Sequence, residues 1–134
     1  MAYWLLKTEP SVYSYDDLVS EKKTVWNGVS NNLALKHLRG MNPGDLAFIY
    51  HTGEEKSIVG IAEIVSPPYP DPKGGDPRLV VVDLKPKGRL SNSVPLSEVK
   101  TRKDLAAFPL VRLPRLSVMP VAAGEWKLLL SMSK

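Results

Sequence analysis

The chain has 134 residues, of which 43% are hydrophobic and 24% charged, a composition typical of one globular domain and unlike that of a disordered segment. Lys and Arg outnumber Asp and Glu by 18 to 14, and the resulting net charge of +4 suits a polyanionic partner without defining one. The absence of cysteine excludes disulfides, thiolate metal ligands and a cysteine nucleophile. Since neither a secretory leader nor a membrane-spanning apolar run is present, we expect a cytoplasmic protein that does not contact membranes.

The N-terminal segment predicts a strand followed by a short helix. Tyr3–Thr8 is apolar and aromatic, and Pro10 ends it because proline lacks a backbone donor and forces the preceding residue into an extended conformation. Ser14 and Asp17 form a capping-box pattern, which predicts a helix that continues through Val19.

A turn and a second helix are predicted next. Asn27-Gly28 is a turn signal. Ser30 or Asn31 can cap a helix with apolar residues at helical spacing, and Gly40 is expected to end it in a left-handed conformation.

The middle of the chain predicts a β-hairpin. Leu46–Tyr50 and Ile58–Val65 are two strands joined by a polar loop. The second strand is apolar on both faces, so we expect it to be central. Gly60 inside it indicates a bulge or the close approach of another group.

The C-terminal half contains a proline-rich loop and several short elements. Its prolines and glycines predict no regular structure over Pro67–Pro77. The elements expected beyond it are a strand over Leu79–Leu84, a helical turn at 98–100 capped by Ser97, a strand over Leu116–Val121, and a helix over Gly124–Leu130. Short strands that alternate irregularly with short helices predict an α+β fold with a curved, barrel-like sheet and a ligand site at its mouth.

The sequence contains no motif that would indicate an enzyme. It lacks phosphate-binding glycine loops, a nucleophile elbow and any metal-ligand spacing, so we predict no catalytic residues, no metal and no cofactor. His51, at the end of a strand, fits a general base or pocket residue, but also a histidine bonded to the backbone.

Trp26 is the aromatic residue with the most suggestive neighbours. Trp4 and Trp126 lie among leucines and are predicted to be core residues, whereas small polar side chains follow Trp26. An indole beside amide and hydroxyl groups fits a pocket in which a base stacks and its edge is read. The pattern alone slightly favours the other role, a tryptophan that closes the end of the barrel.

Several segments in order resemble the EVE domain family. They are Tyr3–Pro10, Trp26–Asn31, Gly44-Asp45 with Phe48–Thr52, Gly60–Val65, Tyr69–Asp71, and Arg115–Val121 with Glu125-Trp126. The resemblance covers residues 1–134 as a single domain and implies a PUA-like fold, a curved mixed β-sheet or pseudo-barrel flanked by short helices. It also implies binding of a modified nucleobase, with DNA favoured over RNA, and possible restriction or RNA-processing partner proteins.

From this resemblance we expect a ligand site formed by residues from several elements. Trp26 would stack on the base and Tyr69 would cover it. The expected polar contacts come from Lys7, Ser30, Asn31, His51 and Thr52, and Arg115 is a candidate phosphate contact. Trp26, Asn31, Tyr50 and Thr52 are predicted to converge on one concavity.

Two positions depart from the usual family pattern. Ser30 stands where the family commonly has arginine, which removes a planar charged fork that could hold a phosphate or a base edge. Thr52 replaces a common serine and keeps the hydroxyl. Two other functions fit the sequence: a small nucleotide-directed enzyme with His51 as base, and a protein-interaction module without a ligand.

Overall fold

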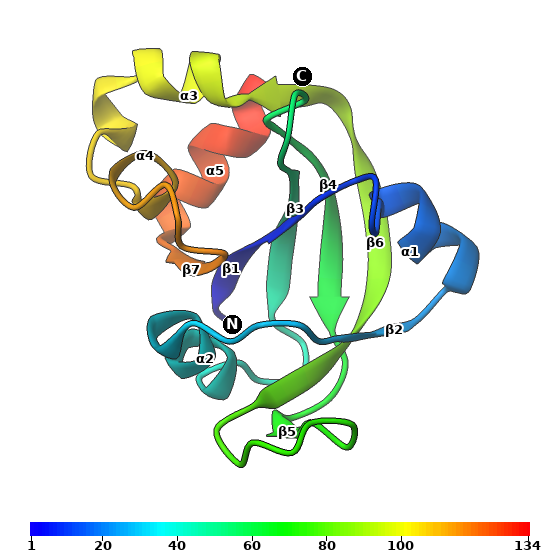
Figure 1. The fold of residues 1–134 in the computed structure, drawn as a ribbon. Coiled ribbons are helices and arrows are strands. Elements are labelled where there is room, and N and C mark those ends of the chain that lie inside the picture. The colour runs from blue at the N-terminus through cyan, green and yellow to red at the C-terminus, as the bar shows by residue number, and fades with distance from the viewer.

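A computed structural model describes residues 1–134 and contains one mixed β-sheet of seven strands. The strands are β1 (Tyr3–Thr8), β2 (Thr24–Trp26), β3 (Leu46–His51), β4 (Ser57–Ile64), β5 (Tyr69–Pro70), β6 (Val80–Pro95) and β7 (Val118–Val121). Their order is β2-β6-β4-β3-β1-β7, and β5 pairs with β6. The β1–β3 pair is parallel and the other pairs are antiparallel. The predicted α+β fold with a curved mixed sheet is confirmed (Figure 1).

Short helices flank the sheet. They are α1 (Tyr15–Glu21), α2 (Asn32–Arg39), α3 (Leu96–Thr101), a 3₁₀ turn (Lys103–Leu105), α4 (Pro109–Arg112) and α5 (Ala123–Met132). In Figure 1, α1 lies beside β6, whereas α3, α4 and α5 gather at the opposite side of the curved sheet. None of the helices has the length and apolar character that crossing a membrane requires.

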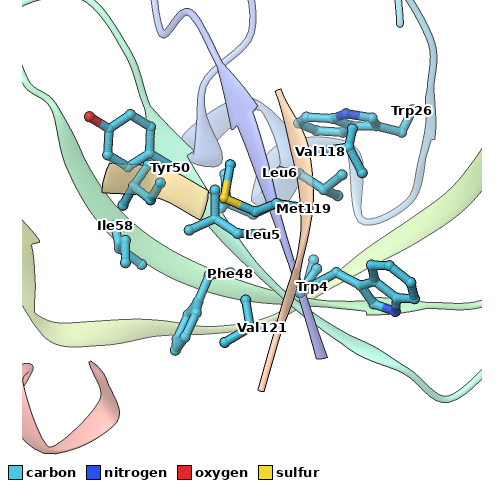
Figure 2. Packing of buried hydrophobic residues seen from close by; sticks show 14 of the residues in the cluster. Trp4, Leu5, Leu6, Trp26, Phe48, Tyr50, Ile58, Val118, Met119 and Val121 are labelled. Atoms are coloured by element: carbon cyan, nitrogen blue, oxygen red, sulfur yellow. The ribbon is translucent and has the colours of Figure 1, made fainter. Parts of the chain in front are cut away.

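The core is built on the central strands. Figure 2 shows side chains of β1, β3, β4 and β7 packed together, with Trp4 and Trp26 among them. Trp126 of α5 stacks on Phe48 with ring centroids 3.8 Å apart, which joins the last helix to the sheet. Trp4 and Trp126 are 8% and 4% exposed, so both are core residues as predicted.

Several local predictions are confirmed. The β1 strand has the predicted bounds, and both hydrogen bonds of the Ser14–Asp17 capping box are present at the start of α1. The β4 strand is central, between β3 and β6. A Cβ on Gly60 would lie only 2.5 Å from the Tyr15 ring, and the β4–β6 register shifts at this glycine, so both expected features of Gly60 occur.

Other local predictions are wrong. Gly40 ends α2 with a φ of −87°, in the right-handed region. Pro95, not Ser97, occupies the cap position of α3. The proline-rich loop contains the short strand β5, because Tyr69 and Pro70 pair with Val81 and Val80.

The largest error concerns β6. It continues eleven residues beyond the predicted end at Leu84, through Pro86 and Gly88. Irregular register in the β4–β6 pair accommodates these residues, since shifts occur between Ile58 and Gly60 and between Ile61 and Ala62. The strand β2 is missing from the prediction, although it positions Trp26 by pairing with Val82 of β6.

Candidate nucleobase site

A cavity of about 410 Å³ opens where β1 ends and β2 passes. Its lining comes from the end of β1, the segment before α1, the end of α1, and β2 with the turn that follows: Thr8, Val12, Tyr13, Glu21, Thr24, Val25, Trp26, Asn27 and Gly28. The volume lies at the small end of the range for ligand pockets, so the cavity suits one base or a similar small ring.

Two aromatic side chains shape this cavity. Trp26 is only 7% exposed, and the Tyr13 ring meets it edge to face, with centroids 6.1 Å apart and planes at 82°. The indole is held by β2 pairing and by core packing, so it is a rigid wall and not a mobile surface residue. A rigid aromatic surface loses little conformational freedom when a base stacks on it.

Hydrogen bonds hold the polar groups of the cavity. The Thr8 hydroxyl donates to the Tyr13 carbonyl over 2.7 Å, and the Tyr13 phenol donates to Oε1 of Glu21. Burial, followed by the hydrogen bond to Glu21, raises the pKa of Tyr13 to about 12. The phenol therefore keeps its proton at neutral pH and remains a donor to the Glu21 carboxylate.

The turn after β2 supplies unused donors. The backbone N–H groups of Asn27, Gly28, Val29 and Ser30 make no hydrogen bond within the protein. Gly28 has a φ of +81°, a conformation that glycine adopts without strain. Asn27 and Gly28 line the cavity, so their amides are placed to bind the acceptor groups of a ligand.

Of the predicted ligand-binding residues, only Trp26 lines this cavity. The structure does not bring Trp26, Asn31, Tyr50 and Thr52 together on one concavity. Asn31 instead caps α2, where its side chain accepts from the Ala34 amide, and Ser30 is exposed beside it.

Lys7 and Tyr50 form a pair outside this cavity. The Lys7 ammonium lies 5.7 Å from the Tyr50 ring centroid and donates to the Pro114 carbonyl over 2.9 Å. Burial lowers the pKa of Lys7 and raises that of Tyr50. Tyr50 is 4% exposed, so it serves as a support for Lys7 and not as an open wall.

Both ring nitrogens of His51 have partners within the protein. Nε2 accepts from the Tyr15 amide at 3.0 Å, which assigns the ring proton to Nδ1, 2.9 Å from Oε1 of Glu55. This buried histidine has no free nitrogen for a proton transfer. The Thr52 hydroxyl lies 3.2 Å from Oε2 of Glu9 and 3.4 Å from the Thr8 carbonyl oxygen and has one proton to donate to them. The structure contains no cluster of three His, Asp or Glu side chains suited to a metal ion.

Arg115 and Tyr69 lie outside the cavity. Arg115 lines a second hollow of about 350 Å³ together with Asn31, Leu33 and residues 112–116. Tyr69 donates to the Asp83 carboxylate at 2.6 Å, and this bond raises its pKa to about 12. Sequence reasoning did not place Thr8, Val12, Tyr13, Glu21, Asn27 or Gly28 in the site. Of these, Thr8, Asn27 and Gly28 carried a signal, because they lie in the family-like Tyr3–Pro10 and Trp26–Asn31 segments.

The curved mixed sheet with short flanking helices, and a cavity at one end of it, define a PUA-like domain. The chain belongs to the EVE domain family, whose sequence pattern matches residues 2–132. Mouse thymocyte nuclear protein 1 is 31% identical over 166 aligned residues, which cover 98% of this chain and 74% of the mouse protein.

Solved structures of related proteins have the same fold. A protein of Rhodopseudomonas palustris is 46% identical, with a TM-score of 0.94 over 99% of this chain and 93% of that one. Human THYN1, solved in complex with DNA containing 5-methylcytosine, is 28% identical, with a TM-score of 0.90 over 100% of this chain and 98% of that one.

Proposed function

We propose that this protein is a non-enzymatic reader of a modified base in DNA, and that the base enters the Trp26 cavity. The observation that carries the proposal is the cavity itself, in which a rigid indole wall, unpaired backbone donors and a volume suited to one base occur together. The ligand class is supported by the human relative solved with DNA containing 5-methylcytosine.

The proposed reader binds a base that has left the double helix. Stacking on an aromatic side chain contributes about 1–3 kcal/mol per base, whereas removing a base from a duplex costs a few kcal/mol. Single-stranded or extruded bases should therefore bind more tightly than paired ones.

The second hollow offers a path for the backbone of the bound strand. Gly28 lines the cavity and Asn31 lines the hollow, and three residue steps span at most about 11 Å, so the two features are neighbours. Arg112 and Arg115 line the hollow and form no ion pair within the protein. Their charge suits the phosphates next to the bound base.

The absence of a catalytic role is part of the proposal. His51 was the candidate base, and both of its nitrogens are engaged by Tyr15 and Glu55. The cavity also contains no serine, lysine or histidine that could act as a nucleophile or base.

The rim of the cavity allows a test that avoids the core. Val12 lines the cavity while 81% exposed, so Val12→Asp puts a negative charge at the entrance without disturbing packing. Val19→Asp is the matched control, because Val19 is also exposed and does not line the cavity. Single-stranded oligonucleotides with one cytosine or one 5-methylcytosine would be titrated against both variants and the unmodified protein.

We expect the unmodified protein and Val19→Asp to prefer the methylated oligonucleotide, and Val12→Asp to bind both oligonucleotides more weakly. Equal binding by Val12→Asp and Val19→Asp would place the ligand elsewhere. Equal affinity of the unmodified protein for the two oligonucleotides would overturn the proposal that it recognises 5-methylcytosine.

A further inference from the structure

Glu21 is the only charged side chain that lines the base cavity. It is the last residue of α1, and Lys22 ends the helix directly after it in a left-handed conformation. Oε1 of Glu21 accepts the Tyr13 phenol proton, and Oε2 makes no hydrogen bond within the protein. One carboxylate oxygen thus fixes the side chain, and the other is free to accept from a ligand.

The neighbouring polar groups on this side of the cavity also act as acceptors. The Thr8 hydroxyl uses its proton on the Tyr13 carbonyl, and the Tyr13 phenol uses its proton on Glu21. Each oxygen therefore offers only lone pairs to a further partner. A ligand group that meets Thr8, Tyr13 and Glu21 must supply the hydrogens itself.

The donors of the cavity come from a different segment. They are the free backbone amides of Asn27 and Gly28, the side-chain amide of Asn27, which makes no hydrogen bond within the protein, and the Thr24 hydroxyl of β2. The cavity thus combines an acceptor group from α1 and β1 with donors from β2 and the turn after it. Cytosine has a matching edge, since it carries a donor amino group at position 4 and acceptors at N3 and O2.

We propose that Glu21 is a specificity-determining residue that accepts from the 4-amino group of the bound base and rejects a base with a 4-carbonyl group. The inference rests on the proposed function and adds a rule to it: the site separates 5-methylcytosine from thymine. These two bases share the pyrimidine ring and its 5-methyl group, so stacking and shape cannot distinguish them. At position 4 thymine presents an oxygen, which would face the carboxylate with no proton between them.

The test compares three versions of one single-stranded oligonucleotide, with cytosine, 5-methylcytosine or thymine at the same position. The variant is Glu21→Gln, whose amide can still accept from Tyr13 and can also donate to a carbonyl. Glu98→Gln is the control, because Glu98 is an exposed residue of α3 and its replacement changes the net charge equally. Thermal melting of both variants checks the fold, and Glu21 is exposed, so we expect little change.

The unmodified protein and Glu98→Gln should prefer 5-methylcytosine over thymine by at least about tenfold. In Glu21→Gln this ratio should fall to near one, mainly because thymine binds more tightly. A ratio that stays high in Glu21→Gln, or a ratio of one in the unmodified protein, would overturn the inference.

The two proposals fail in different ways. If the unmodified protein prefers 5-methylcytosine over cytosine but does not reject thymine, the reader function stands and the role of Glu21 is wrong. If none of the three oligonucleotides binds, the proposed function is overturned together with the inference that rests on it. A loss of stability in Glu21→Gln with an unchanged ratio would show that Glu21 only anchors Tyr13.

Discussion

Trp4 and Trp26 are almost equally buried, at 8% and 7% exposure, yet they differ in what their indole nitrogen does. The Trp4 indole donates to Oδ2 of Asp45 at 3.0 Å. The Trp26 indole N–H makes no hydrogen bond within the protein and is not sealed from solvent, and Trp26 lines a cavity. Figure 2 shows both rings at the edge of the packed core.

The environment of Trp4 is complete without a ligand. The Asp45 carboxylate accepts from the amides of Ala2 and Asn42 as well as from Trp4. Burial by itself would raise the pKa of Asp45, but these hydrogen bonds outweigh it and hold the pKa below its ordinary value. Burial alone therefore does not distinguish Trp4 from the proposed ligand-binding Trp26, which differs in lining a cavity beside polar groups that are not bonded within the protein.

Replacing each tryptophan by alanine should give the largest difference between Trp4 and Trp26. Trp4→Ala and Trp26→Ala should each lower the free energy of unfolding by about 3–5 kcal/mol, because both remove a buried indole. Only Trp26→Ala should also lose the preference for the methylated oligonucleotide, since stacking contributes about 1–3 kcal/mol. Denaturant unfolding and oligonucleotide titration measure the two effects.

The corresponding leucine variants keep more of the packing and serve where an alanine variant does not fold. If both Trp26 variants retained the preference for the methylated oligonucleotide, the proposal that the base stacks on Trp26 would be wrong.

The next effect concerns the partner of Trp4. Asp45→Ala should cost on the order of 3 kcal/mol, because it leaves the Trp4 indole and two backbone amides without their acceptor. The base preference should remain. Because the folded pKa of Asp45 is depressed, its stabilisation is present above the unfolded pKa of about 3.9 and is lost as the pH falls through the folded pKa.

Denaturant unfolding of both proteins from neutral to acid pH checks this prediction. The difference between them should shrink as the pH falls. A difference that grows toward low pH would contradict the assigned direction of the pKa.

A smaller effect distinguishes recognition of the base from binding of the DNA backbone. Arg115→Ala should weaken binding of plain and methylated oligonucleotides alike, and loss of one phosphate contact should flatten the logarithmic salt dependence by about 0.7. Arg102→Ala is the control, because Arg102 is exposed, forms no ion pair and lies outside both hollows. Titrations at several salt concentrations decide it. A selective loss for the methylated oligonucleotide would instead assign Arg115 to base recognition.

The smallest effect concerns the ionisation of Tyr13, which packs against Trp26, and of Tyr69. Burial and the bond to Glu21 raise the pKa of Tyr13 to about 12, and the bond to Asp83 does the same for Tyr69. A raised folded pKa stabilises the protein fully below the unfolded value of about 10, and this stabilisation is lost as the pH rises through about 12.

The ultraviolet absorbance of tyrosinate, recorded against pH, should therefore show late ionisation that Tyr13→Phe and Tyr69→Phe each reduce. Ionisation of either residue near pH 10 would contradict its hydrogen bond.

The sequence predicted the features that neighbouring residues determine. The capping box of α1, the β3–β4 hairpin and the bounds of β1 depend on short-range patterns, and all three are confirmed. The irregular alternation of short strands and helices predicted the α+β class with a curved sheet, and the EVE family resemblance narrowed it to a PUA-like domain.

The remaining features depend on contacts between distant segments. The β6 strand contains Pro86 and Gly88, which locally disfavour a strand, and pairing with the distant β4 together with the bond from the Gly88 amide to the Tyr15 hydroxyl maintains it there. Tyr13 and Glu21 reach the cavity because β2 returns past the end of β1, and no local pattern indicates that return. The polar neighbours of Trp26 drew attention to the one predicted ligand residue that lines the cavity, but one of those neighbours, Asn31, caps a helix.

Entry of the base into the Trp26 cavity can be followed directly through the three indole N–H signals in a proton–nitrogen correlation spectrum during titration with a 5-methylcytosine oligonucleotide. Trp26→Phe assigns the signal of Trp26, because one cross-peak disappears. We expect this signal to shift strongly, whereas the signal of the Trp4 indole, which is bonded to Asp45, should barely move. Saturable binding that leaves the Trp26 signal unchanged would show that the base does not enter this cavity.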